Sequence, residues 1–187
     1  MIQKKYEKRV FLLSGILFTI SAGTALHFLF DWSGRLILAA LIAPVNESVW
    51  EHLKLLFFPF LLFSALEALI RRPGPAFYAA GTCGILAGLA SIPVLFYTFT
   101  GVTGIHALWA DILIFLISVV LTFFLRFSLE KRIRPGRTAL FLSFSVLILL
   151  VLLFFLLTFF PPALPLFQDP MTGGYAPSRI SFGPMGA

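Results

Sequence analysis

The ionisable side chains that could do chemistry lie near the ends of long apolar segments. His27 and Asp31 are four residues apart, a spacing that places both on one face of a helix. The complete set of such residues is His27, Asp31, Glu47, Glu51, His52, His106 and Asp111. Charged groups inside a bilayer are costly and tend to be functional, so a set gathered at one depth predicts a polar site there.

Imidazole nitrogens combined with carboxylate oxygens are typical ligands of zinc and similar divalent metals. We expect His27, His52 and His106 as ligands. Asp31 or Asp111 would be a fourth ligand, or would contact a ligand without touching the metal. Glu47 or Glu51 would then be the general base that activates a metal-bound water. The pattern is unspecific, because the sequence contains no HExxH motif.

Two other interpretations of the same residues stay open. In one, His and Glu pairs near a short helix relay protons or bind a substrate, as in a small transporter or a proton-linked binding protein. In the other, the charges are structural, as in an accessory membrane subunit, and reach water or pair with each other. Glu51 and Lys54 could form such a pair, and so could Glu67 and Arg71.

The composition indicates a membrane protein. Of its 187 residues, 59% are hydrophobic and only 12% are charged, whereas soluble domains are about 25% charged. The net charge of +6 does not indicate nucleic-acid binding, because the basic residues occur in short clusters between apolar segments rather than on one face. The expected partner is the lipid bilayer, with a lipid, peptide or small polar ligand at its outer leaflet.

The apolar segments predict an all-α polytopic bundle with five transmembrane helices and one short helix. The predicted spans are 10–30, 46–70, 75–99, 105–128 and 138–160, the first being a retained span rather than a signal peptide. The apolar part of 31–45 is too short to cross a bilayer, which favours a re-entrant or interfacial helix; six spans is the alternative. Asn46 is the expected N-cap of the second span. The last span carries no charge and is expected to be the most exposed to lipid.

Small residues mark one expected helix contact. Ala80, Gly84 and Gly88 recur every four residues in the third span, a stripe that allows another helix to approach closely. We expect this stripe to serve packing.

Lys and Arg residues predict the orientation. They are concentrated in the N-terminal segment, the turn at 71–72 and the loop at 130–137, and these three segments would lie on the same side. The positive-inside rule places the N-terminus in the cytoplasm, and the histidines and C-terminus outside. We expect one transmembrane domain over 1–160 and an extracytoplasmic, irregular tail over 161–187, because that tail is rich in Pro and Gly.

Three segments carry a resemblance to a known family. They read HFLFDWSG at 27–34, PVNESVWEHLKLLFFP at 44–59 and LFQDPMTGGY at 166–175. The chain resembles, over most of its length, an uncharacterised family of small multi-pass bacterial membrane proteins. This resemblance implies a bacterial plasma-membrane protein of five or six spans, and it carries over no catalytic or binding residue.

Overall fold

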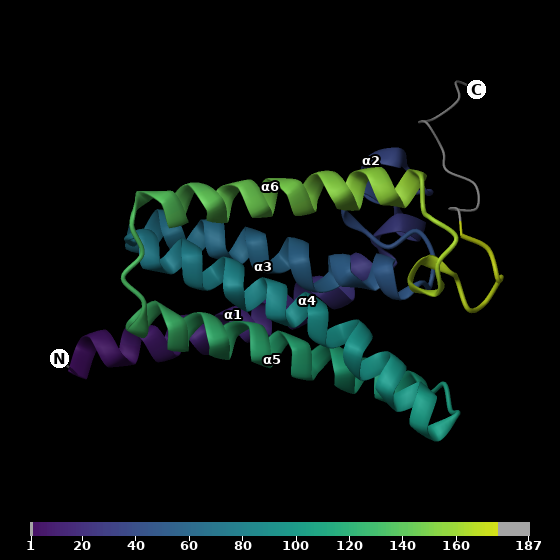
Figure 1. The fold of residues 1–187 in the computed structure, drawn as a ribbon, viewed down its shortest axis with the longest axis horizontal. Helices are drawn as coiled ribbons and strands as arrows, with labels where there is room; N and C mark the ends of the chain where they lie inside the picture. Colours follow the sequence, from purple (N-terminus) through teal and green to yellow (C-terminus); the bar gives the residue numbers. More distant parts are fainter. Residues whose placement is uncertain (1, 176–187) are drawn as a thin grey trace.

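The computed structural model describes residues 2–175 and is helical throughout its core (Figure 1). In chain order the elements are α1 (Ile2–Trp32), α2 (Ile37–Ile42), α3 (Val49–Arg71), α4 (Pro75–Thr103), α5 (Leu108–Arg132), α6 (Arg137–Phe159) and the short 3₁₀ helix η1 (Pro165–Phe167).

Five of the helices described in residues 2–175 are long and apolar enough to cross a membrane: α1, α3, α4, α5 and α6. The chain is therefore a polytopic helix bundle, consistent with a multi-pass membrane protein. The short helix α2 has 6 residues, which at about 1.5 Å per residue span far less than a hydrocarbon core of about 30 Å. The prediction of five spans plus one short helix is confirmed, and the alternative with six full spans is not realised.

The bundle is arranged around the central helices α3 and α4. Figure 1 shows α6 along one side and α1 and α5 along the other, in agreement with the contacts of α4 with both α5 and α6. Phenylalanine rings fill much of the interior, including Phe57, Phe60 and Phe123. Helix α6 has the smallest share of buried residues among the five spans, as the absence of charge in 138–160 predicts.

The glycine stripe of α4 packs against α5. A Cβ atom added to Gly84 would lie 2.6 Å from the backbone oxygen of Thr122, and one added to Gly88 would lie 1.8 Å from the Thr122 hydroxyl. Only a residue without a side chain allows this approach, so the predicted packing role of the stripe is confirmed.

The N-terminus of α3 differs from the expectation. Ser48, not Asn46, is the N-cap, and its hydroxyl accepts a hydrogen bond from the Glu51 amide at 3.3 Å. The side chain of Asn46 instead accepts from the Ser48 amide at 3.0 Å, which forms a local turn. The helix begins later because residues 43–48 are used to return the chain from α2.

We call the end of the bundle where α1 ends and α3 begins the histidine end, and the opposite end the basic end. At the basic end Glu67 pairs with Arg71, as predicted, and also with Arg126 of α5, a pairing that the sequence does not predict. Arg71 extends the pairing to Glu130 at 3.0 Å. These ion pairs join α3 to α5.

The segment after α6 is partly ordered. Phe167 of η1 is buried, and its ring lies 5.0 Å from the ring of Trp50 on α3. Asp169 closes the following turn by accepting from the Met171 amide and the Thr172 hydroxyl, each at 2.9 Å. Residues 161–175 are therefore largely irregular, as predicted, but they dock on the histidine end; 176–187 lie outside the described residues.

Candidate metal centre

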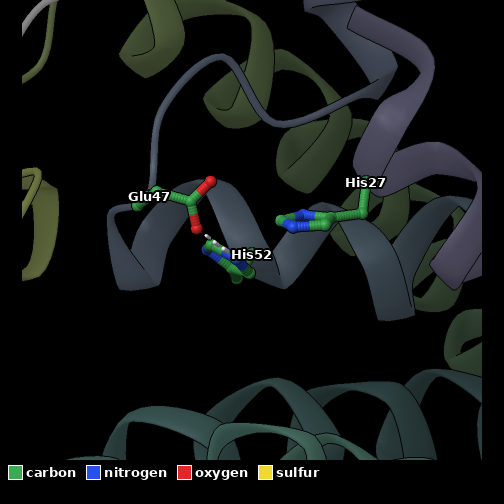
Figure 2. Close-up of side chains that lie close together, drawn as sticks. All are labelled: His27, Glu47 and His52. Atoms are coloured by element: carbon green, nitrogen blue, oxygen red, sulfur yellow. Dashed lines mark ion pairs between the residues drawn. The ribbon is translucent and has the colours of Figure 1, made fainter. Parts of the chain in front are cut away.

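His27, Glu47 and His52 come together at the histidine end. Each offers one ligand atom, and these three atoms lie within 4.8 Å of one another. Figure 2 shows His27 reaching from α1, and Glu47 from the segment before α3, toward His52 on the first turn of α3. Among the residues that the structure describes, it is the one group of three or more His, Cys, Asp and Glu with this proximity.

A close contact between α1 and α3 brings the two histidines together. A Cβ atom on Gly23 would lie 2.5 Å from the backbone oxygen of Leu55, so the two backbones nearly touch there. Because the helices run in opposite directions, one turn from Gly23 leads to His27 and one turn back from Leu55 leads to His52. The imidazole centroids lie 5.2 Å apart.

The hydrogen bonds of His52 define its tautomer. Its Nδ1 lies 2.9 Å from the backbone oxygen of Ser48. A carbonyl oxygen can only accept, so Nδ1 carries the proton. In the neutral ring Nε2 then has a free lone pair, which is the arrangement typical of a metal-binding histidine.

The Nε2 atom of His52 faces Oε2 of Glu47 at 3.4 Å. With Nδ1–H already donated to Ser48, this approach needs either a second proton on the imidazole or a cation between the two atoms. Charge-assisted N–H···O bonds are typically about 2.7–2.9 Å long, so 3.4 Å is long for the protonated form. Two ligands about 2.0–2.1 Å from one tetrahedral zinc ion lie about 3.3 Å apart, close to the separation seen here.

The other two residues of the group are also suited to a cation. The His52 side chain, with Nε2 at 3.4 Å, lowers the pKa of Glu47 below its ordinary value, and partial burial opposes this shift. The carboxylate is therefore ionised at neutral pH. Nδ1 of His27 is buried and has no hydrogen-bond partner among the described residues. An unsatisfied buried nitrogen beside an ionised carboxylate favours a bound ion or water at this place.

The chain matches one protein family over most of its length. The model of the Family of unknown function (DUF6512) matches residues 1–176. The chain belongs to the DUF6512 family. This confirms the resemblance to an uncharacterised family, and the apolar helices agree with its expected membrane nature. No curated protein and no solved structure matches the chain significantly.

Asp111 of the DUF6512 chain lies on the first turn of α5. It is exposed, and its charge interacts with His52, Glu47 and His106. His106 itself is exposed in the loop before α5, with its ring 5.9 Å from that of Phe96. Helix α5 begins after His106, at Leu108, which allows His106 and Asp111 to approach one another despite their five-residue spacing.

Two other candidate residues of the DUF6512 chain lie outside the group. Asp31 is exposed and pairs with Arg35 at 3.0 Å. Glu51 is 2% exposed, and its carboxylate is occupied by Lys54 at 2.7 Å, as the i, i+3 spacing predicts. The Gly23 contact that sets the geometry joins residues far apart in the chain and is not predicted by the sequence pattern. The Ser48 carbonyl, which orients His52, was missed and carries no side-chain signal.

Proposed function

We propose that this protein is a metal-dependent membrane enzyme of hydrolase type, with zinc or a similar divalent ion held by His27, Glu47 and His52. The observation that carries this proposal is the 3.4 Å approach of His52 Nε2 to Glu47 Oε2 while Nδ1 donates to the Ser48 backbone. A cation between the two atoms satisfies both lone pairs at the spacing expected for two zinc ligands.

The set of donors fits catalysis better than a purely structural site. Two histidines and one glutamate leave a fourth position of tetrahedral zinc open, as in catalytic sites, whereas structural sites are closed by four protein ligands. Bound zinc would supply a Lewis acid and acidify a water molecule. In this proposal Glu47 is a ligand rather than the general base. We assign the role of proton acceptor to Asp111 on the first turn of α5, whose charge interacts with those of His52 and Glu47.

The surroundings favour a substrate at the membrane surface. Trp32 and Trp109 are exposed near the histidine end, 71% and 63% respectively, and tryptophan is enriched at membrane–water interfaces. A lipid or peptide with a hydrolysable bond at headgroup depth fits this position. The basic loops support a bacterial plasma-membrane orientation with the N-terminus in the cytoplasm and the histidine end outside.

Metal analysis of the purified protein tests the binding part of the proposal. We expect one zinc ion per wild-type chain and loss of that zinc in His27→Ala, Glu47→Ala and His52→Ala. His106→Ala is the matched control, because His106 is exposed and outside the group, and it should keep its zinc. Wild-type protein that takes up no zinc, cobalt or manganese would overturn the proposal.

The hydrolase part needs a separate measurement. Zinc-loaded protein in vesicles should cleave at least one of three chromogenic probes: an acyl ester, an anilide or a phosphodiester. Asp111→Asn should lower that rate while it leaves the zinc content unchanged. Zinc binding without cleavage of any probe would overturn the hydrolase assignment and keep the metal site.

The 3.4 Å approach of His52 Nε2 to Glu47 Oε2 is also compatible with a second candidate function. If the second imidazole nitrogen of His52 carries a proton instead of facing a metal, the His52–Glu47 pair is a proton-binding site. A proton-linked binding protein would then show no zinc uptake, together with a His52 titration by NMR that Glu47→Gln shifts toward lower pH.

A further inference from the structure

We infer that Glu51 and Lys54 are positioning residues for the proposed metal centre, because they hold the segment that carries Glu47 in place. Neither side chain belongs to the three-residue group, and both are almost completely buried, at 2% and 0% exposure. The test of this inference by zinc affinity rests on the proposed function, whereas its test by hydrogen exchange does not require a bound metal.

Lys54 closes the end of the short helix α2. Its Nζ donates to the backbone oxygens of Ala40 and Ala43 at 2.8 and 3.2 Å, and to Glu51 Oε2 at 2.7 Å. An ammonium group has three hydrogens, so its donor capacity is used completely. The last carbonyl groups of a helix have no partner within that helix. Without Lys54 these buried carbonyl groups would lack a hydrogen-bond donor, which would lower the stability of the fold.

Glu51 holds the chain on the other side of this contact. Its Oε2 accepts from the Val45 amide at 3.0 Å. Its Oε1 lies 2.9 Å from the Thr158 hydroxyl of α6, which shares its one hydrogen between Glu51 and the Phe154 backbone oxygen at 2.7 Å. The Glu51 amide donates to the Ser48 hydroxyl, so the same residue also fixes the N-cap. Glu51 is therefore bound to Val45 and to Ser48, which lie on either side of Glu47 in the sequence.

One turn of α3 thus performs two tasks. Its buried side carries Glu51 and Lys54, which bind residues 40, 43, 45 and 48. The adjacent residue His52 points toward Glu47 and His27. The distance between His52 and Glu47 is set through this common turn, since a half-exposed carboxylate on a free loop would not hold one position.

The burial of this pair argues for a role beyond general stability. An ion pair inside a bundle is costly to desolvate, and apolar residues of similar volume often replace such a pair without loss. Here every side-chain hydrogen bond from the pair to another residue ends on residues 40–45, at the end of α2 and just after it, or on α6. Its specific effect is therefore to define the conformation of that segment.

Lys54→Met tests this inference, with Arg126→Met as the matched control. Both native side chains are 0% exposed and paired with a glutamate, but Arg126 lies at the basic end, away from the candidate site. Two quantities are measured for each variant in detergent: hydrogen exchange of the amides at 43–48, and the zinc dissociation constant.

In Lys54→Met we expect faster exchange at 43–48 and zinc binding that is about 10–100-fold weaker, as for other residues that support metal ligands. Arg126→Met should lower thermal stability but leave both quantities at 43–48 and at the metal unchanged. Glu51→Gln keeps an acceptor for Val45 and should show a smaller effect in the same direction; it replaces Lys54→Met if that variant does not fold.

Two results would overturn the inference. The first is wild-type exchange at 43–48 in both Lys54→Met and Glu51→Gln. The second is an equal loss of zinc affinity in Arg126→Met, which would show that any destabilisation weakens the site. If the wild type binds no metal, the proposed function fails, but the exchange measurement still decides whether the pair holds the segment.

Discussion

Gly23 on α1 lies against the backbone of Leu55 on α3, where a Cβ atom would be only 2.5 Å from the Leu55 carbonyl oxygen. This contact fixes the separation of the two helices one turn away from His27 and His52. The imidazole centroids are 5.2 Å apart as a result. A packing feature inside the bundle therefore determines the geometry of the candidate site at its end.

Gly23→Val should separate α1 from α3 and weaken zinc binding. The added side chain meets backbone, which cannot move aside as a flexible side chain can, and overpacking of this kind costs about 1–3 kcal/mol. Zinc titration and thermal unfolding measure the two effects. Gly101→Ala is the control, because a Cβ there meets no atom within 4 Å and both quantities should stay unchanged. A Gly23→Val protein with wild-type zinc affinity would show that the contact does not set the site.

Gly88→Ala should destabilise the contact between α4 and α5. Its new Cβ would lie 1.8 Å from the Thr122 hydroxyl, which is held in place by a 2.8 Å hydrogen bond to the Ser118 backbone oxygen. We expect a loss of about 1–3 kcal/mol in unfolding free energy. The double variant Gly88→Ala/Thr122→Ala removes the clashing hydroxyl and should recover part of that loss. Equal stability of the single and double variants would contradict this explanation.

Arg126→Met should be among the more destabilising single changes at the basic end. Arg126 is 0% exposed and pairs with Glu67, so its removal leaves a buried carboxylate without that partner. Breaking one side of a buried pair costs about 3–5 kcal/mol. The double variant Glu67→Gln/Arg126→Met should lose less than the sum of the single losses, as measured by thermal unfolding. Strictly additive losses would mean that the two side chains do not interact energetically.

Phe167→Ala should release the segment after α6 from the bundle. Its ring packs against Trp50, whose ring centroid also lies 4.9 Å from that of Phe154. We expect faster proteolysis within 161–175 and quenching of Trp50 fluorescence by added acrylamide. Leu164→Ala is the control, because Leu164 is 54% exposed and should leave both signals unchanged. Unaltered proteolysis in Phe167→Ala would contradict a docking role for this ring.

The fold could be predicted from the sequence to a large extent, because apolar length alone decides which segments cross a bilayer. The segments 46–70 and 138–160 correspond to α3 and α6 within a few residues. The start of α3 could not be placed as well. Asn46 and Ser48 are both good N-caps, and the choice between them depends on how the chain returns from α2.

The kinds of residue at the candidate site could be predicted from the sequence, but which of these residues come together could not. The sequence placed all three histidines at one end, yet it could not show that His106 stays in an exposed loop while His27 and His52 meet. That difference depends on the Gly23 contact, which involves residues far apart in the chain. The Glu51–Lys54 pair was predictable from its i, i+3 spacing, whereas its partners Ala40 and Thr158 were not.

The bond between Thr158 and Glu51 also has a consequence for how the protein is made. Thr158 lies at the end of α6, and among the described partners of the Glu51 carboxylate it is the last to be synthesised. A nascent chain that ends before α6 would carry a buried carboxylate with an unfilled acceptor beside a short helix that cannot cross the bilayer. Membrane quality-control proteases should therefore degrade such truncated chains faster than chains that contain α6.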